Sequence, residues 1–490
     1  MRRAALLFLA FSSCTSGSGG TPDGGSEAGA DGGAPAFAGY TGPKCDYSVG
    51  APPGAIDVAL DASRAVVDMM GSAPVRVRLG LGGGTDSSAK GYADPSRSVV
   101  VTWESIAPDP NAKVRLGKNP AQLDDVRSGY TWTTPPPMTG LGTNDPPASL
   151  HEVHLCGLEP GTTYTYQVGG GAAGQELWSA PQTFTTAPAT GPVRIGVSGD
   201  SRDSKDVFAM VQRRMATAPV NLQIFTGDVV VFGTSDAQYT QWLDAIWRDP
   251  MAQGKFLTLG QQLMVMLPGN HDASSPQFFG NFALPGTGDF AEAFGSFDVG
   301  PVHFLFWDDQ RLALDPQSAA SKAILDFIKA DLGRANAKRA QVPFVVMAEH
   351  RGPFSTSNHQ GDSDLVRVRD LVAPLAEMGK VDLFLSGHDH EYERSKPLTG
   401  PAANPTVQPA GMGTVYVIAA GAGANAYGIG GTPVAYREKN VAFGSSTPYV
   451  GVYLLMDASG TTLDVKAYGM KASASNPMGD DVIDQFTLTH

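Results

Sequence analysis

The chain has 490 residues, 42% of them hydrophobic and 17% charged, which is typical of a globular protein with roughly two to four domains. Its formal net charge of −13 argues against nucleic acid or an anionic membrane surface as a partner. An anionic substrate would also be repelled by this overall charge, so a site for one needs strong local positive charge.

The first 14 residues have the pattern of an export signal. Two arginines follow Met1, Ala4–Phe11 is a short apolar run, and Ser12-Ser13 precedes Cys14. We interpret residues 1–14 as a lipoprotein-type signal peptide with a lipid on Cys14; plain secretion with loss of Cys14 is the alternative. The chain is therefore predicted to be exported, either to the cell envelope as a lipoprotein or to the periplasm or medium.

Residues 15–36 are rich in Gly, Ser, Ala and Asp and contain no large apolar side chain. Such a segment cannot bury a core and is predicted to be a flexible tether. If Cys14 is lipidated or removed, Cys45 and Cys156 remain as an even pair in an exported protein. This predicts one disulfide, with two separate buried thiols as the alternative.

Residues 37–188 are predicted to form an all-β domain. Short β-rich runs separated by Gly, Pro, Asn and Asp turns indicate a sandwich: Ser98–Trp103, His151–Leu155, Thr163–Val168 and Gln182–Thr185. The stretch Leu158–Tyr164 resembles the fibronectin type III pattern around its tyrosine corner. His151 and His154 are interpreted as strand-surface or edge residues and not as ligands.

Five apolar runs in the second half of the chain end abruptly in polar residues of one kind. These residues, all ligand types for metals, are Asp200, Asp228, Asn270-His271-Asp272, Glu349-His350 and His388-Asp389-His390. Helical segments are predicted between the runs at residues 206–216, 237–248, 319–335 and 365–378. Because α/β sheets place ligands beyond the carboxyl ends of their strands, the five ends are predicted to form one site for two metal ions.

The order of these motifs resembles the calcineurin-like metallophosphoesterase superfamily. The tail Gly387–Ser395 and the stretch Phe297–Phe304 are similar to purple acid phosphatases in particular. The resemblance implies an α/β four-layer sandwich, two mixed sheets flanked by helices, over residues 189–490. It also implies the fibronectin III-like domain in front of it.

The resemblance also implies roles for the ligand-type residues. Asp228 would bridge two metals, Asp200 and His390 would hold the first, and the second would take Asn270, His350 and His388. The metal ions, whether iron, zinc or manganese, would lower the pKa of a bound water so that hydroxide attacks phosphorus.

Other residues would serve the substrate. His271 would contact the phosphoryl group, with Asp272 as an orienting carboxylate. His359 is the candidate proton donor, with a solvent-facing loop residue as the alternative. Arg202 either contacts substrate phosphate or pairs with a carboxylate, and His303 is expected to pack within its strand.

The sequence departs from the purple acid phosphatase pattern at Val231, where those enzymes have the tyrosine whose charge transfer to ferric iron gives their colour. A second family position, often histidine, is Arg202 here. The first metal is thus one protein ligand short, a gap for water or Asp203 to fill. A colourless protein is expected unless Tyr239 or Tyr392, the nearest tyrosines in sequence to the site loops, takes over.

Together these patterns predict an exported metal-dependent phosphatase acting on phosphate monoesters of small molecules. A phosphodiesterase of the same superfamily is the enzyme alternative, and a surface-binding lipoprotein with a degenerate site is the non-enzyme alternative. Membrane contact is expected only through the N-terminal lipid.

Overall fold

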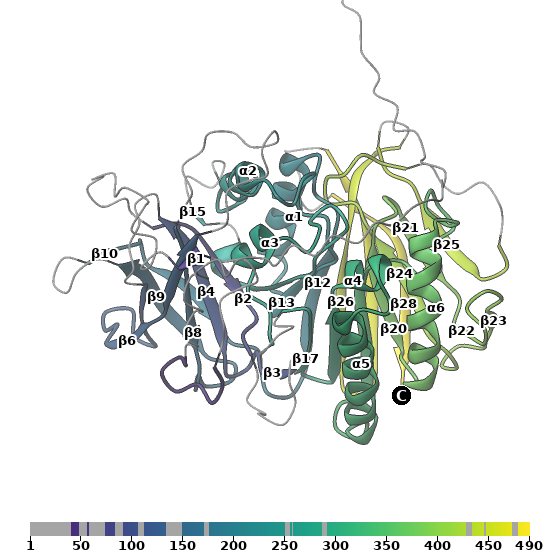
Figure 1. Cartoon of the computed structure of the whole chain (residues 1–490), viewed down its shortest axis with the longest axis horizontal. Helices are drawn as coiled ribbons and strands as arrows, with labels where there is room; N and C mark the ends of the chain where they lie inside the picture. Colours follow the sequence, from purple (N-terminus) through teal and green to yellow (C-terminus); the bar gives the residue numbers. More distant parts are fainter. Residues whose placement is uncertain are drawn as a thin grey trace, which may run out of the picture. The chain divides into compact units, whose positions relative to one another are not determined.

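The computed structural model describes residues 41–48, 56–57, 74–83, 92–105, 112–133, 149–170, 176–249, 255–256, 258–286, 292–427, 434–444, 447–472 and 479–490 (Figure 1). The predicted signal peptide, its Cys14 and the tether lie outside these residues. Among the described helices, none combines the length and apolar character that a membrane span requires.

The N-terminal part of the described chain consists of strands. They are β1 (Ile56–Asp57), β2 (Val75–Gly80), β3 (Tyr92–Ala93), β4 (Val99–Ser105), β5 (Lys113–Gly117), β6 (Asp125–Ser128), β7 (Tyr130–Thr133), β8 (Ser149–Leu155), β9 (Thr163–Gly170), β10 (Leu177–Trp178) and β11 (Gln182–Thr185). Two antiparallel sheets form, in the orders β1-β7-β8-β4-β2 and β10-β9-β5-β6, with β11 also paired to β9. Side chains of both sheets share one core, which includes Trp103, Val153, Leu116 and Phe184. The all-β prediction is confirmed.

Two local predictions in this part are also met. Cys45 and Cys156 form a disulfide. The Tyr164 hydroxyl accepts a hydrogen bond from the Glu159 amide at 3.0 Å, the contact that defines a tyrosine corner. The placement of His151 and His154 at the surface was wrong: both are buried, because polar partners inside the sandwich satisfy their ring nitrogens.

The C-terminal part alternates strands and helices. Its strands are β12 (Val193–Ser198), β13 (Leu222–Phe225), β14 (Arg248–Asp249), β15 (Lys255–Phe256), β16 (Leu263–Met266), β17 (Phe294–Val299), β18 (Val302–Trp307), β19 (Phe344–Arg351), β20 (Leu383–Gly387), β21 (Tyr392–Ser395), β22 (Leu398–Thr399), β23 (Thr406–Val407), β24 (Val415–Ala419), β25 (Arg437–Val441), β26 (Tyr449–Ser459), β27 (Thr462–Lys471) and β28 (Asp481–Thr489). Its helices are α1 (Lys205–Thr217), α2 (Asp236–Ile246), α3 (Pro276–Asn281), α4 (Asp309–Leu314), α5 (Ala319–Ala337) and α6 (Ser363–Met378). The four predicted helices correspond to α1, α2, α5 and α6, whereas the short α3 and α4 were not predicted.

Two mixed sheets run through this part in the orders β16-β13-β12-β26-β27-β28 and β25-β21-β24-β20-β19-β18-β17-β3. Strands β12, β13 and β16 are parallel to one another, and so are β18, β19, β20 and β24. Parallel strands end at the same edge of a sheet, so the polar residues that follow them are brought together.

Strand β20 shows how the layers are held. Its Leu383 and Leu385 belong to the core that both sheets share, while Phe384 between them faces a second core formed with α5 and α6. Both faces are apolar because both are covered, as expected for parallel strands. Figure 1 shows α5 and α6 lying along this sheet. The predicted fold of two mixed sheets with flanking helices is confirmed.

One strand end differs from the prediction. His350 was expected in a loop after an apolar run, but β19 continues through Glu349 and His350 to Arg351. Its pairing with β20 shifts register between Ala348 and Arg351. Such an irregularity re-aims side chains, which explains how a residue inside a strand contributes to a strand-end site.

Candidate metal centre

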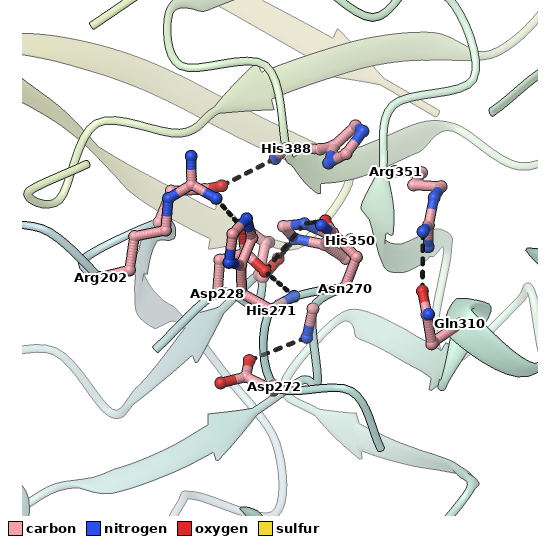
Figure 2. Close-up of polar contacts among 12 residues, drawn as sticks. Arg202, Asp228, Asn270, His271, Asp272, Gln310, His350, Arg351 and His388 are labelled. Carbon is pink, nitrogen blue, oxygen red and sulfur yellow. Dashed lines mark hydrogen bonds and ion pairs between the residues drawn. The ribbon is translucent and has the colours of Figure 1, made fainter. Parts of the chain in front are cut away.

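The carboxylates of Asp200 and Asp228 and the imidazole of His350 meet at the carboxyl ends of β12, β13 and β19. One ligand atom from each lies within 4.8 Å of the other two, and all three side chains are buried. Figure 2 shows the side chains of Asp228, Asn270 and His350 turned toward one another. Because three strands far apart in the sequence supply these groups, their meeting is a consequence of the sheet order.

The backbone turns sharply at three of the predicted ligands. Asp200, Asp228 and His388 have positive φ angles of 61°, 58° and 72°. Residues other than glycine pay roughly 1–3 kcal/mol for such conformations, which cluster at functional sites. The turns direct these side chains back over the sheet edge. A Cβ added at Gly269 would lie 2.2 Å from Asp228 Oδ1, so that position has room only for glycine.

His350 connects the carboxylates to Asn270. Its Nδ1 donates to the Thr226 carbonyl at 2.8 Å, so the lone pair of Nε2 points the other way. Nε2 lies 2.9 Å from Asn270 Oδ1 and 3.3 Å from Asp228 Oδ1. Three electron-rich atoms facing one another are stabilised by a cation between them.

Three of the predicted ligands each have a buried polar atom without a hydrogen-bond partner in the described structure: Asp200 Oδ2, His388 Nε2 and His390 Nε2. His390 is oriented by its other nitrogen, which donates to the Asn425 carbonyl at 2.6 Å. A buried polar atom left unpaired costs about 1–3 kcal/mol, so such atoms call for an explanation. Metal ions would satisfy all three, and the residues present therefore fit a metal site.

The charges of the cluster agree with this. Burial and the charge of Asp228 raise the pKa of Asp200 well above its ordinary value. Burial opposes ionisation of Asp228, but His350, His271 and Arg202 outweigh it and lower its pKa.

Burial and the neighbouring His350 hold the pKa of His388 well below its usual range, and burial and Arg202 lower that of His390 to about 4. Neutral imidazoles beside carboxylates that need a counter-charge are what a metal ion requires.

His271 and Asp272 follow Asn270 in the chain but have different hydrogen-bond partners. The His271 amide donates to Asp228 Oδ1 at 2.9 Å, and its ring Nδ1 donates to the Val231 carbonyl at 2.8 Å. Asp272 instead accepts from the amides of Gly269 and Val229 and from the Tyr239 hydroxyl. The expected orienting contact from Asp272 to the His271 ring is therefore not made; Asp272 holds the loops together, and burial raises its pKa to about 7.

Arg202 and His359 both reach the centre from outside the cluster. Arg202 Nη1 lies 3.3 Å from Asp228 Oδ2. Figure 2 shows the guanidinium group pointing toward this carboxylate. His359 stacks on His388 with ring centroids 4.2 Å apart, and its Nδ1 donates to Asp362. Its side chain is 24% exposed, so His359 lies at the rim of the site and neither in open solvent nor in the core.

Tyr427 belongs to this site and was missed from the sequence. It lies in the loop after β24 and stacks on His390 with ring centroids 3.9 Å apart. Its hydroxyl lies 3.2 Å from Arg202 Nη2 and 3.4 Å from His359 Nε2. The rule that located the other residues, a polar group beyond the end of a parallel strand, also applies to this loop.

The residues considered as replacements for the missing tyrosine lie elsewhere. Asp203 accepts from the Asn425 amide at 2.9 Å and pairs with Arg202 at 3.4 Å. Tyr239 donates to Asp272, and Tyr392 donates to Asp484 at 2.7 Å. Each of the three is already engaged by a partner outside the ligand cluster.

Two mixed sheets with carboxylates and imidazoles gathered at their parallel strand ends define a metallophosphoesterase fold. Residues 193–392 match the calcineurin-like phosphoesterase domain, and residues 90–186 match the purple acid phosphatase N-terminal domain. The chain carries both of these domains, and several of the relatives that it matches are named purple acid phosphatases.

Purple acid phosphatase 21 of Arabidopsis thaliana is 24% identical over 295 residues, which cover 60% of this chain and 62% of that protein. Human acid phosphatase type 7 is 25% identical, covering 68% of this chain and 76% of that protein. The chain therefore spans a little under two thirds of the plant relative. The structure of a purple acid phosphatase from yellow lupin seeds has the same fold, with a TM-score of 0.67 at 18% identity over 85% of this chain and 74% of that one.

Proposed function

We propose that this chain is an exported, dinuclear metal-dependent phosphatase that hydrolyses phosphate monoesters. The observation that carries the proposal is the set of buried, unpaired donor atoms on Asp200, His388 and His390 beside the bridging position of Asp228. The names of the homologues support the same class of reaction.

The predicted ligand roles fit the contacts. Asp200 and His390, whose Oδ1 and Nε2 lie 3.6 Å apart, would hold one ion, and Asn270, His350 and His388 would hold the other. Asp228 would be shared. When bound, the ions would supply the positive charge that polarises the phosphate and lowers the pKa of water.

The chain's own residues would orient the ester. With Nδ1 of His271 held by Val231, Nε2 is the ring nitrogen left to contact a phosphoryl oxygen. The guanidinium of Arg202 would stabilise negative charge on the same group. Nδ1 of His359 donates a hydrogen bond to Asp362 and keeps its proton in the neutral ring. The proton that the protonated ring gives up is therefore the one on Nε2, and this proton would go to the leaving oxygen.

Hydrolysis is tested by loading the purified chain with zinc, manganese or iron and assaying p-nitrophenyl phosphate and bis(p-nitrophenyl) phosphate. Monoester turnover should exceed diester turnover. Asp228→Asn should abolish activity and lower bound metal, because it removes the charge that two cations share. The exposed Asp326→Asn on α5 is the control. Retention of activity and two metals in Asp228→Asn would overturn the site, and a diester preference would identify a phosphodiesterase.

Export to the cell envelope rests on the signal-like N-terminus. In an envelope fractionation, the wild-type chain should accompany the membranes, and Cys14→Ala should move to the soluble exported fraction. Recovery of the wild-type chain in the medium would indicate plain secretion.

A further inference from the structure

The loop after β24 is fixed to the metal ligands by backbone hydrogen bonds. The amide of Ala422 donates to the Gly199 carbonyl and that of Ala424 to the Asp200 carbonyl, both at 2.8 Å. The amide of Tyr427 donates to the His390 carbonyl at 3.2 Å. Tyr427 is therefore held against the centre from both sides, and its position does not depend on its own hydroxyl.

The hydroxyl of Tyr427 is the meeting point of three loops. Arg202 comes from the loop after β12, His359 from the segment between β19 and α6, and Tyr427 from the loop after β24. With the hydroxyl 3.2 Å from Arg202 and 3.4 Å from His359, the three polar groups meet at one place. Arg202 also reaches Asp228 Oδ2, so this place adjoins the bridging carboxylate.

The contacts of Arg202, which is partly buried, are long. They measure 3.2 Å to Tyr427, 3.3 Å to Asp228 and 3.4 Å to Asp203. By contrast, Arg194, Arg214 and Arg394 each have a carboxylate partner at 2.6, 2.9 and 2.7 Å. Charge-assisted hydrogen bonds normally measure about 2.7–2.9 Å. Arg202 is thus loosely held, and a closer anion would improve its contacts.

We propose that Tyr427 binds the substrate phosphate as the third member of a phosphate clamp formed with Arg202 and His359. The clamp rests on the proposed phosphatase activity and explains why the substrate would be a monoester. A monoester presents three unesterified oxygens, which serve the metal ions, His271 and the clamp together. A diester has only two, and its second organic group would take the place of the oxygen that the clamp is proposed to bind.

The experiment compares Tyr427→Phe with wild type and with the control Tyr449→Phe. The hydroxyl of Tyr449, the first residue of β26, contacts Asp481 of β28. Inorganic phosphate binding to the metal-loaded proteins is measured by calorimetry and as product inhibition. Tyr427→Phe should weaken phosphate binding and raise KM for the monoester by about tenfold. Diester kcat/KM should fall by less than monoester kcat/KM, so that the monoester-to-diester ratio drops; bound metal should stay the same, and Tyr449→Phe should match wild type.

A second variant, Arg202→Lys, keeps the charge but loses the planar fork, and should weaken phosphate binding similarly. Unchanged phosphate affinity and monoester-to-diester ratio in Tyr427→Phe would overturn the clamp, as would loss of a metal equivalent. If wild type hydrolyses neither ester, the proposed function fails, whereas calorimetry with phosphate still tests the clamp.

Discussion

Two groups of buried histidines in this chain are alike in exposure but differ in the hydrogen bonds of their rings. One group lies at the metal centre, which we call the cradle: His350, His388 and His390. The other group lies inside the sheets, which we call the framework: His151, His154 and His303. All six are almost fully buried, so burial alone does not identify a ligand.

The bonding of the second ring nitrogen separates His388 and His390 from the framework group, whereas Nε2 of His350 faces Asn270 Oδ1 at 2.9 Å. Framework His151 contacts Ser105 Oγ at 2.7 Å and Thr131 Oγ1 at 2.8 Å, and framework His303 lies between Asp298 and Asp331. Cradle His390 has one nitrogen on a carbonyl and the other unpaired, and the sheet protects it from water. An unpaired ring nitrogen that is buried beside a carboxylate indicates a ligand position, because a framework histidine has no reason to leave it unpaired.

The largest expected effect comes from substituting one histidine of each group and comparing activity, bound metal and stability. His390→Gln should reduce phosphatase activity by more than about 100-fold, since even removal of a residue that only supports a ligand costs 10–100-fold. It should lower bound metal while leaving the stability of the metal-free protein nearly unchanged. His151→Gln should do the reverse, lowering the urea midpoint with metal content intact. Equal loss of stability in both variants would contradict the distinction.

A second comparison lies within the cradle, between ligands and the neighbouring His271. His271→Ala should lower turnover by about 100- to 1,000-fold with bound metal unchanged, because the ring is expected to contact phosphate only. Metal analysis by mass spectrometry checks the second half of this prediction. Loss of one equivalent would place His271 among the ligands.

The strand ends were predictable because each signal is local. An apolar run that stops at Gly-Asp or Gly-His-Asp-His can be read without knowing its neighbours. The inclusion of His350 within β19 was not predictable from local sequence, because it depends on the register between β19 and β20, two segments distant in the chain. Tyr427 was missed because the residues before it in its loop are Gly and Ala apart from Asn425, and the loop holds no acid or histidine. Its role follows only from the sheet order that places β24 beside β20.

A smaller effect is expected from framework His303, on how the free energy of unfolding depends on pH. Burial opposes protonation of its ring, but the hydrogen bonds to Asp298 and Asp331 outweigh burial and raise its pKa to about 9. The folded chain then holds this proton more tightly than the unfolded chain, whose histidine has a pKa of about 6.5. The stabilisation is complete below about pH 6.5 and is lost as the pH rises through about 9, amounting to about 3 kcal/mol.

Urea unfolding of the metal-free protein between pH 6.5 and pH 9.5 measures this loss. In His303→Gln, the same pH interval should change the free energy of unfolding by less than in wild type. Parallel curves for the two proteins would show that the Asp298–His303–Asp331 contact does not carry a proton difference.

The smallest expected effect is an absent absorption band. Val231 lies where purple acid phosphatases have their tyrosine ligand, and its carbonyl instead orients His271. Tyr239 and Tyr392 are buried and bonded to carboxylates. Tyr427 is the tyrosine beside cradle His390, but Arg202 and His359 engage its hydroxyl. We therefore expect the protein loaded with ferric and divalent ions to lack a tyrosinate band.

The visible spectra of the loaded wild type and of the loaded Tyr427→Phe and Tyr239→Phe variants show whether Tyr427 is a hydrogen-bond donor to phosphate or a metal ligand. No band in any of the three keeps Tyr427 as a hydrogen-bond donor to phosphate, with the first metal held by Asp200, Asp228 and His390 and by water. Such an oxygen and nitrogen set suits zinc, manganese or ferrous iron equally well, so the ion at that position should exchange readily. A band that vanished only in Tyr427→Phe would instead make Tyr427 the replacement for the missing tyrosine. The clamp would then lose its third member, because a tyrosinate oxygen that coordinates a metal has no proton with which to form a hydrogen bond to the ester.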